Sequence, residues 1–270
     1  MANLGIIGFG NMGQAIAERV KGKYTVYVFD SDKDKTGNLT GINVCASVSD
    51  LANRCEAVIL AVKPQDFEPV LKEIGIRLDK LFISIAAGIT TGFMEEYLGQ
   101  ARVVRAMPNL AAIIGEAATC LAKGKYALAE DLNAAKNIFE LIGNTWVIEE
   151  GLINAATAIS GSGPAYIFYD LETRGITGLE VPTGLKDEYV ELLKQAALAV
   201  GFDAQTAFEL SVCTVLSSIH LATGNSATEL KKRVTSKGGT TEEALKVLSA
   251  GGTWALAAAA AKKRAGELSR

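Results

Sequence analysis

The chain has little of what most hydrolases and metalloenzymes need for their chemistry. Its 270 residues include one histidine, His220, and four scattered cysteines. No pair of cysteines has the spacing of metal ligands, so we expect no metal site. No cysteine nucleophile and no Ser/His/Asp set is visible, and we expect neither. His220 lies in an apolar helical pattern and is interpreted as a structural residue, because an isolated histidine needs partners to act as a catalyst or ligand. The cysteines are Cys45, Cys55, Cys120 and Cys213.

The chain also lacks a strongly basic segment and a long apolar run. The formal net charge is -3, and phosphate binding needs a basic face, so nucleic acid is not expected as a partner. The runs Lys231–Arg233 and Lys262–Arg264 fall in helical patterns and are interpreted as solvated faces. No stretch approaches the ~20 apolar residues that span a bilayer, and no basic leader precedes the first strand pattern. We therefore expect no membrane association and no secretory signal, and a cytoplasmic protein with reduced thiols.

Short apolar runs alternate with helical patterns over residues 1–150. This alternation predicts an α/β domain with a mostly parallel, doubly wound sheet. Helical patterns lie near Phe67–Ile74, Thr91–Leu98 and Ala129–Leu141. The expected strands are Leu4–Ile7, Thr25–Phe29, Ala57–Val62, Leu81–Ile85, Arg102–Arg105, Ala117–Leu121 and Thr145–Ile148.

Residues 151–270 contain helical patterns and no convincing strand, which predicts an all-α second domain. The segment Arg174–Gly184 holds three glycines and a proline and is interpreted as an exposed loop. The expected helices are Leu152–Ile159, Pro164–Leu171, Lys186–Val200, Ala204–Ala222, Glu229–Val234, Thr241–Leu248 and Thr253–Leu268.

A nucleotide-binding fingerprint follows the first expected strand and opens a helical pattern. Its glycines allow a tight turn, a close approach of the backbone to a pyrophosphate, and close packing of helix on strand, while the helix N-terminus attracts negative charge. A glycine-rich turn without a ligand is the alternative. The residues assigned to cofactor binding here are Gly8, Gly10, Asn11, Met12 and Gly13.

Asp30 follows the second expected strand, where an acidic residue accepts hydrogen bonds from the ribose of NAD and repels the 2′-phosphate of NADP. Ser31, Lys33 and Lys35 lie close enough in sequence to relieve that repulsion. We assign Asp30 and Ser31 to the cofactor, which we expect to be NAD(P)H, with NADH favoured over NADPH. A simple turn residue is the alternative for Asp30.

Two further turns follow neighbouring expected strands. In doubly wound sheets, ligands lie outside the carboxyl ends of strands, and small residues at 86–88 let a cofactor ring approach the backbone. Lys63 is either a site residue or a solvated lysine. The cofactor residues assigned in these turns are Ala61, Val62, Lys63, Pro64, Ala86, Ala87 and Gly88.

A Gly-Gly-Thr-Thr turn, residues 238–241, opens a helical pattern near the C-terminus. Thr240 and Glu243 have the spacing of a capping box. A glycine-rich turn at a helix N-terminus offers free N–H groups and a positive dipole end, which suit a small anion. Together with the fingerprint, this turn predicts an enzyme that binds a nucleotide cofactor at one end and an acid substrate at the other.

Six motifs, in order and over essentially the whole chain, resemble those of the Δ1-pyrroline-5-carboxylate reductase family. The last two are specific to it, whereas the first is shared by many dehydrogenases. The motifs are Gly8–Gly13, Ala61–Gln65, Ser84–Gly88, Arg105–Asn109, Ser160–Tyr166 and Ser236–Thr241.

The resemblance implies a Rossmann domain followed by an all-α dimerisation domain, and homodimers that assemble into a decamer. It implies that hydride from NAD(P)H reduces the cyclic imine of pyrroline-5-carboxylate to L-proline, the last step of proline biosynthesis. Such an imine needs little beyond hydride proximity and an anchored carboxylate. Thr241 is then the catalytic residue, as a hydrogen-bond donor or proton relay to the ring nitrogen.

The resemblance also places the other residues of the site. Met107 and Asn109 join the cofactor residues, and Arg105 either belongs to the site or stabilises a strand end. The substrate-binding residues are Ser162, Ser236, Gly238, Gly239, Thr240 and Thr241.

The chain departs from the family pattern at two places. Lys237 stands where the family usually has proline, and Asp170–Glu188 looks like an insertion that splits a helix. One alternative is a β-hydroxyacid-type dehydrogenase, which needs a lysine on the helix after Gly161–Pro164, and none occurs before Lys186. The other alternative is a non-catalytic nucleotide-sensing protein.

Overall fold

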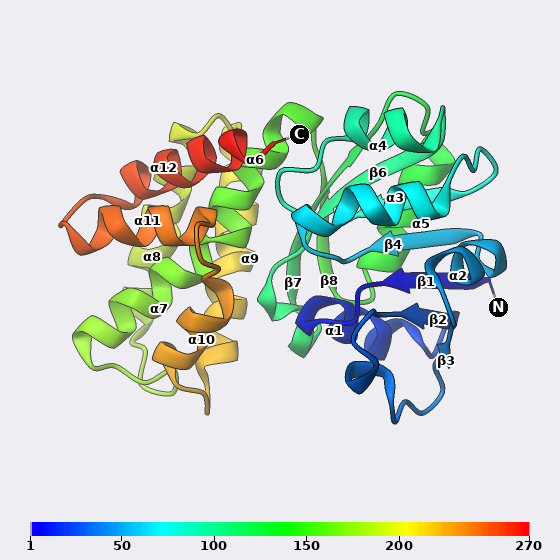
Figure 1. Ribbon diagram of the computed structural model, residues 1–270. Helices are drawn as coiled ribbons and strands as arrows, with labels where there is room; N and C mark the ends of the chain where they lie inside the picture. The colour runs from blue at the N-terminus through cyan, green and yellow to red at the C-terminus, as the bar shows by residue number, and fades with distance from the viewer. Residues whose placement is uncertain (1, 270) are drawn as a thin grey trace. The chain divides into compact units, whose positions relative to one another are not determined.

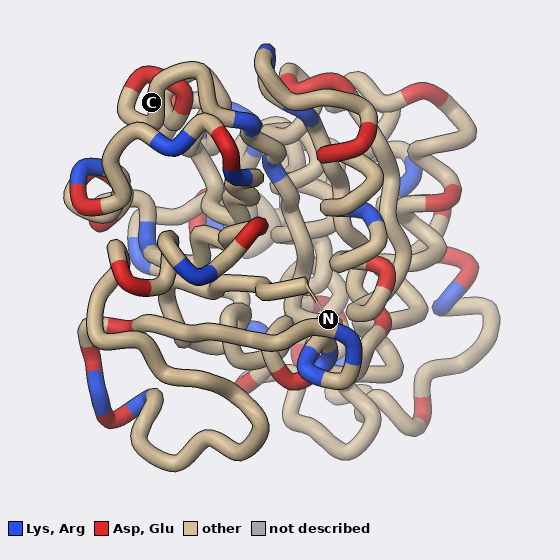
Figure 2. The backbone as a smooth tube through the Cα atoms, turned by 90° about the vertical axis from the view of Figure 1, so that its right-hand side faces the viewer, with Lys and Arg blue, Asp and Glu red and all other residues tan. Residues whose placement is uncertain are grey.

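A computed structural model describes residues 2–269 (Figure 1). The chain forms two compact units: residues 2–106 with 121–150, and residues 107–120 with 151–269. Acidic and basic positions are interspersed along the backbone (Figure 2). Within the described residues, no helix has both the length and the apolar character needed to cross a membrane.

A sheet of eight strands runs in the order β3-β2-β1-β4-β5-β6-β7-β8, and every pair from β3 to β6 is parallel. The order reverses between β1 and β4, which makes this the switch point of a doubly wound sheet. The predicted parallel α/β fold is confirmed, and β3 is the strand that the sequence patterns missed. The strands are β1 Asn3–Ile7, β2 Thr25–Phe29, β3 Asn43–Val44, β4 Ala57–Leu60, β5 Leu81–Ser84, β6 Arg102–Met107, β7 Ala117–Lys123 and β8 Gly143–Val147.

Five helices accompany the strands of the first unit. The helices over residues 48–54, 67–74 and 91–98 join strand residues in a buried core that includes Leu51, Phe67, Phe82 and Met94. Side-chain caps define two of the helix starts: Ser47 accepts from the N–H of Asp50, and Thr90 accepts from that of Phe93. The helices are α1 Asn11–Val20, α2 Val48–Arg54, α3 Phe67–Ile74, α4 Thr91–Leu98 and α5 Ala129–Phe139.

From residue 151 onward the described segment contains helices joined by loops and no strand, as predicted. The short helix α6 continues into a π-helical turn, Thr157–Gly161, before α7 begins. Buried aromatic rings join three helices, because Trp254 packs edge-on against Tyr166 and stacks on Tyr189. The helices are α6 Ile153–Ala156, α7 Gly163–Arg174, α8 Thr183–Ala199, α9 Ala204–Ala222, α10 Ala227–Val234, α11 Thr240–Ser249 and α12 Trp254–Glu267.

Within the apparent insertion Asp170–Glu188, the loop expected at Arg174–Gly184 is confirmed with shorter bounds. Helix α7 continues to Arg174 and α8 begins at Thr183, so only residues 175–182 are non-helical. Polar contacts fix the two helices to each other: Tyr189 Oη donates to Asp170 Oδ2 (2.6 Å), and Arg174 Nε pairs with the same oxygen (2.6 Å).

Gly178, in the loop between α7 and α8, lies against the end of α9. A Cβ at this position would overlap the carbonyl group of Ala222 and the nitrogen of Thr223. We expect Gly178→Ala to lower the free energy of unfolding by about 1–3 kcal/mol, because the overlap is with backbone that cannot rotate away.

Urea unfolding measures this effect, and Gly184→Ala is the matched control. Gly184 lies in the first turn of α8 with open space around its Cβ position, so alanine there is expected to be neutral or stabilising by up to about 1 kcal/mol. Equal effects of the two substitutions would contradict this account of the loop.

Candidate active site

The turn between β1 and α1 has a backbone that requires glycine at two positions. Gly8 has φ of +96°, and a Cβ there would lie 2.7 Å from the carbonyl carbon of Ala61. A Cβ on Gly13 would overlap the carbonyl oxygen of Gly8. Gly10 differs, because no atom lies within 4 Å of its Cβ position. It is the N-cap of α1 and makes no side-chain cap, so the helix presents free N–H groups to open space, as pyrophosphate binding needs.

A pocket of roughly 460 Å³ lies beside this turn. It brings together seven of the residues assigned to the cofactor: Gly8, Gly10, Asp30, Ser31, Ala61, Val62 and Lys63. Its wall is completed by Ile7, Phe29, Lys35, Gln65, Asp66 and Val70. The mixed wall, with apolar faces and a few charged groups, has the chemistry of a nucleotide site.

Asp30 is held in the pocket wall by three donors. Its Oδ2 accepts from the N–H of Phe9 (2.6 Å), and its Oδ1 accepts from the N–H of Asp32 (2.9 Å) and from Lys35 Nζ (3.3 Å). Partial burial alone would raise the pKa of Asp30, but the two backbone donors and Lys35 outweigh it and lower the pKa below its usual value. The pocket therefore carries a fixed negative charge, partly balanced by Lys35.

The other expected cofactor turns follow the carboxyl ends of the strands. Ile7, Leu60 and Ser84 are register partners at the ends of β1, β4 and β5, so the turns after them leave along one edge of the sheet. Gly88, with φ of +77°, closes the turn that contains Ala86 and Ala87. Asn11, Met12 and Gly13 lie in the first turn of α1, and Pro64 begins a 3-10 turn. These residues and Ala86–Gly88 lie outside the pocket wall.

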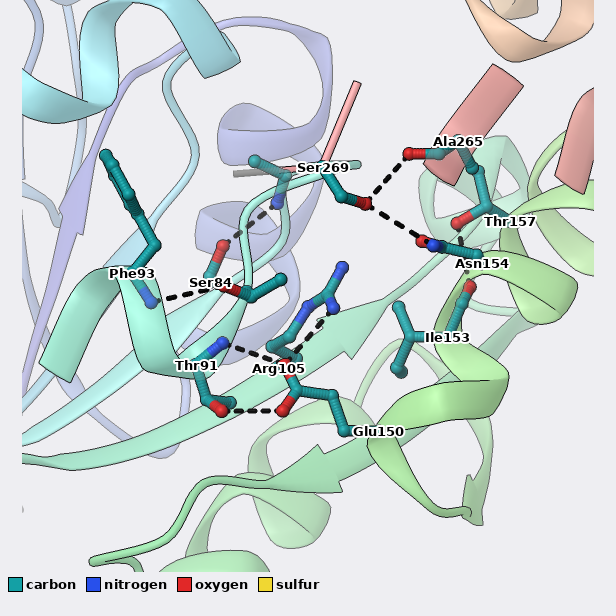
Figure 3. A network of polar contacts seen from close by, with 12 residues as sticks. Ser84, Thr91, Phe93, Arg105, Glu150, Ile153, Asn154, Thr157, Ala265 and Ser269 are labelled. Carbon is teal, nitrogen blue, oxygen red and sulfur yellow. Dashed lines mark hydrogen bonds and ion pairs between the residues drawn. The ribbon is translucent and has the colours of Figure 1, made fainter. Parts of the chain in front are cut away.

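Arg105 lies near the end of β6, in a network with Thr91 and Glu150 (Figure 3). It is almost fully buried, with 3% of its surface exposed. Its Nη1 pairs with Glu150 Oε1 at 3.2 Å. The Glu150 carboxylate also accepts from the N–H and the hydroxyl of Thr91, at 2.8 and 2.6 Å. Burial lowers the pKa of Arg105, and the charge of Glu150 opposes that shift. These contacts join the end of β6 to the first turn of α4 through Glu150, which favours the strand-end role of Arg105.

Asn109 and Met107 lie in residues 107–120. Asn109 is buried, and its Oδ1 accepts from the N–H groups of Ala111 (3.3 Å) and Ala118 (3.2 Å). This geometry makes Asn109 the side chain that closes its own turn, with Met107 buried at the end of β6. His220 has an exposed side chain on α9, and its Nδ1 lies 2.9 Å from Glu116 Oε1.

In the turn before α11, the N–H groups of both glycines bond to acceptors of the turn itself and of the helix that follows. Gly238 has φ of +70°, and its N–H donates to Glu242 Oε2 (2.7 Å), while the N–H of Gly239 donates to the carbonyl of Ser236 (3.0 Å). The expected capping box is wrong: Gly239 is the N-cap, Thr240 is the first helical residue, and Glu242 takes the place expected for Glu243. The backbone N–H groups of Thr240 and Thr241 are left without an intrahelical acceptor.

Three buried hydroxyl groups meet at this helix start. Thr241 Oγ1 donates to Ser162 Oγ at 3.0 Å, and Ser162 Oγ lies 3.1 Å from Thr240 Oγ1. Ser162 immediately precedes α7, and the threonines open α11. The structure thus brings three of the expected substrate-binding residues into contact, next to free N–H groups and a positive helix end that suit a carboxylate.

Arg264 is a residue at this turn that the sequence patterns missed. Its Nε donates to the carbonyl oxygen of Gly238 at 2.9 Å, which places a cation beside the turn. The interpretation of the two basic runs as solvated faces is wrong for Arg264, for Lys262, whose Nζ donates to the carbonyl of Val200, and for Lys231, which pairs with Glu172. The sequence patterns missed this role because Arg264 lies on a different helix, α12, and is distant from Gly238 in sequence.

Comparisons with known proteins cover both units. A family model described as "NADP oxidoreductase coenzyme F420-dependent" matches residues 3–88, and one described as "Pyrroline-5-carboxylate reductase dimerisation" matches residues 183–268. A pyrroline-5-carboxylate reductase of Pisum sativum is 34% identical over 98% of this chain and 96% of its own length. That of Methanosarcina acetivorans is 36% identical over 92% of this chain and 90% of its own length.

Solved structures agree with these relatives. A pyrroline-5-carboxylate reductase from Coxiella burnetii superposes with a TM-score of 0.66 at 33% identity, over 100% of this chain and 99% of its own. A pyrroline carboxylate reductase from Plasmodium falciparum with NADP bound has a TM-score of 0.65 at 26% identity, over 100% of this chain and 98% of its own. The identity above 30% over nearly the whole length decides the matter, and the chain belongs to the pyrroline-5-carboxylate reductase family.

Proposed function

We propose that this protein transfers hydride from NAD(P)H to the cyclic imine of pyrroline-5-carboxylate and so makes L-proline, the last step of proline biosynthesis. The observation that carries the proposal is the pairing of two features in a member of this family. The first unit has a glycine turn beside a nucleotide-sized pocket. The second has a hydroxyl-lined helix start suited to a small carboxylate.

The first unit would hold the cofactor, which supplies the hydride. Gly10 and the N-terminus of α1 fit the pyrophosphate, because open space lies above Gly10 and the helix end is uncapped. Asp30 and Ser31 in the pocket wall fit the adenosine ribose. Ala61, Val62 and Lys63 line the same pocket.

The second unit would hold the substrate. The carboxylate of the imine fits the free N–H groups of Thr240 and Thr241, where the dipole of α11 is positive. Arg264, fixed to the Gly238 carbonyl, adds positive charge beside the turn. The hydroxyl of Thr241 then supplies the hydrogen bond to the ring nitrogen, and an anchored ring needs little else to accept hydride.

We expect Thr241→Val to lower kcat/KM for pyrroline-5-carboxylate by about 10- to 100-fold, which corresponds to one lost hydrogen bond to a charged group. Valine keeps the shape of threonine and removes only the hydroxyl. Steady-state assays with saturating cofactor measure the effect. The control is Ser249→Ala, at the far end of the same helix, where the hydroxyl bonds only to the carbonyl of Lys246. An unchanged kcat/KM in the Thr241 variant would refute the role.

We further propose that the protein acts in the cytoplasm as a homodimer that assembles into a decamer. The buried free thiols of Cys45, Cys55 and Cys120 suit a reducing compartment. The match to a dimerisation model and exposed apolar side chains on α8, α9 and α12 support the dimer. Light scattering tests this, and a monomer mass would contradict it. The exposed side chains are Leu192, Leu198, Phe208, Leu216 and Leu256.

A further inference from the structure

Ser162 is the central member of the hydroxyl cluster at the start of α11. Only 1% of its surface is exposed, against 9% for Thr240 and 5% for Thr241. Both hydrogen bonds of its side chain are to hydroxyl groups of α11, a helix about 80 residues further along the chain. The side chain therefore has no role in capping its own helix, since α7 begins without a side-chain cap.

The geometry of the 3.0 Å contact makes Thr241 the donor and Ser162 the acceptor, and counting protons then shows which direction the other contact can take. Each hydroxyl carries one proton and two lone pairs. The Thr241 hydroxyl donates a hydrogen bond to Ser162 Oγ at 3.0 Å. The Ser162 hydroxyl can then donate its own proton in a hydrogen bond to Thr240 Oγ1 at 3.1 Å. A chain of bonds that all point the same way is cooperatively strengthened. Because its one proton is engaged, Thr241 can offer only lone pairs to a ligand.

We propose that Ser162 is a positioning residue that turns the Thr241 hydroxyl into a hydrogen-bond acceptor, so that the site binds the imine in its protonated, iminium form. This inference rests on the proposed function and specifies it. Hydride adds to the ring carbon of the C=N⁺–H group, and the π electrons move to nitrogen. The nitrogen keeps the proton that it brought, so the enzyme delivers no proton in that step.

Several other polar groups near the helix start are already committed to other partners, which fits this assignment. Glu242 accepts from the N–H of Gly238 and Glu243 pairs with Lys246, whose hydrogen bond lowers the pKa of Glu243. Tyr166 donates its hydroxyl proton to the carbonyl of Ala158 at 2.8 Å, and burial raises its pKa. Arg264 donates hydrogen bonds to the carbonyl oxygen of Gly238 and to Glu267. An acceptor oxygen also offsets the repulsion between an iminium and the positive end of α11.

Isotope effects test the direction of the hydrogen bond. In single turnovers we expect deuterated reduced cofactor to slow the reaction. We expect D₂O to leave the rate of the hydride step nearly unchanged, because no proton is transferred in that step. A D₂O effect that persists and multiplies with the cofactor effect would show that Thr241 gives up a proton in the same step. That result would overturn the inference while it leaves the proposed reductase activity standing.

A double-mutant cycle tests whether Ser162 acts through Thr241. We expect Ser162→Ala to lower kcat about 10-fold with little change in the KM of the cofactor, as loss of one orienting hydrogen bond implies. In the Thr241→Val background the same change is expected to cost nothing more, because the partner is already gone. The control is Ser218→Ala, since Ser218 is equally buried in the same unit and bonds only to the carbonyl of Thr214.

The outcomes separate the two proposals. Additive losses, or no loss in Ser162→Ala, would overturn the positioning role, with the melting temperature of each variant showing that it is folded. Failure of the unmodified protein to reduce the imine would overturn the proposed function, and this inference with it. Loss of activity in Ser218→Ala equal to that in Ser162→Ala would show a packing effect and would also overturn the role.

Discussion

Asp30→Asn is expected to shift the ratio of kcat/KM values for NADH and NADPH toward NADPH by about 100-fold. The Asp30 carboxylate lies in the wall of the nucleotide pocket, and its lowered pKa keeps it ionised at neutral pH. A like charge about 5 Å away costs roughly 3 kcal/mol at an effective dielectric constant of about 20, which is about two powers of ten in affinity. The 2′-phosphate of NADPH would carry such a charge.

Lys35 is expected to add to the change in cofactor preference. It pairs with Asp30 at 3.3 Å and also lines the pocket, so once the Asp30 charge is removed it becomes free to meet a 2′-phosphate. The matched control is Asp32→Asn, which removes the same charge from an exposed side chain two residues away that lies outside the pocket wall. An unchanged cofactor ratio in Asp30→Asn, or an equal shift in the control, would show that Asp30 does not select the cofactor.

Glu150→Ala is expected to lower the free energy of unfolding by about 3–5 kcal/mol, because it leaves a buried arginine without its ion pair. Arg105 has 4% of its side chain exposed, and Glu150 is its partner at 3.2 Å. The substitution also removes the acceptor for both donors of Thr91 at the start of α4. Urea unfolding followed by near-ultraviolet circular dichroism measures the change.

The neighbouring residue provides the control for this prediction. Glu149 is exposed, so Glu149→Ala is expected to change the free energy of unfolding by no more than about 0.5 kcal/mol. Glu150→Gln, which keeps an acceptor for Thr91 and removes the charge, is expected to fall between the two. A loss in Glu150→Ala no larger than that in the control would mean that the buried arginine does not depend on this pair.

The fold could be predicted largely because local patterns and tertiary structure agree. The predicted bounds of β2, α3 and α9 match the structure, and α9 starts where Asp203 accepts from the N–H groups of Gln205 and Thr206. The patterns missed α2 and β3 because these elements are short. Strand β3 has two residues, both exposed, so no apolar run marks it.

In the candidate site, the features set by local sequence could be predicted and those set by tertiary contacts could not. The glycine spacing of residues 8–13 was visible because it is a local requirement of the backbone. The contacts of Ser162 with Thr240 and Thr241, and of Arg264 with Gly238, join residues far apart in sequence. The misplaced capping box has the same cause, since the Thr240 hydroxyl points to Ser162 instead of back to its own helix. Spacing rules cannot anticipate such tertiary partners.

The most direct measurement mixes the purified protein with pyrroline-5-carboxylate and either reduced nicotinamide cofactor, and follows cofactor absorbance together with the proline formed. We predict loss of absorbance matched mole for mole by L-proline, faster with NADH than with NADPH. Binding of cofactor without turnover would point to a nucleotide-sensing protein. Turnover of 2-hydroxy acids with no reduction of the imine would point to a different dehydrogenase, and either result would contradict the account.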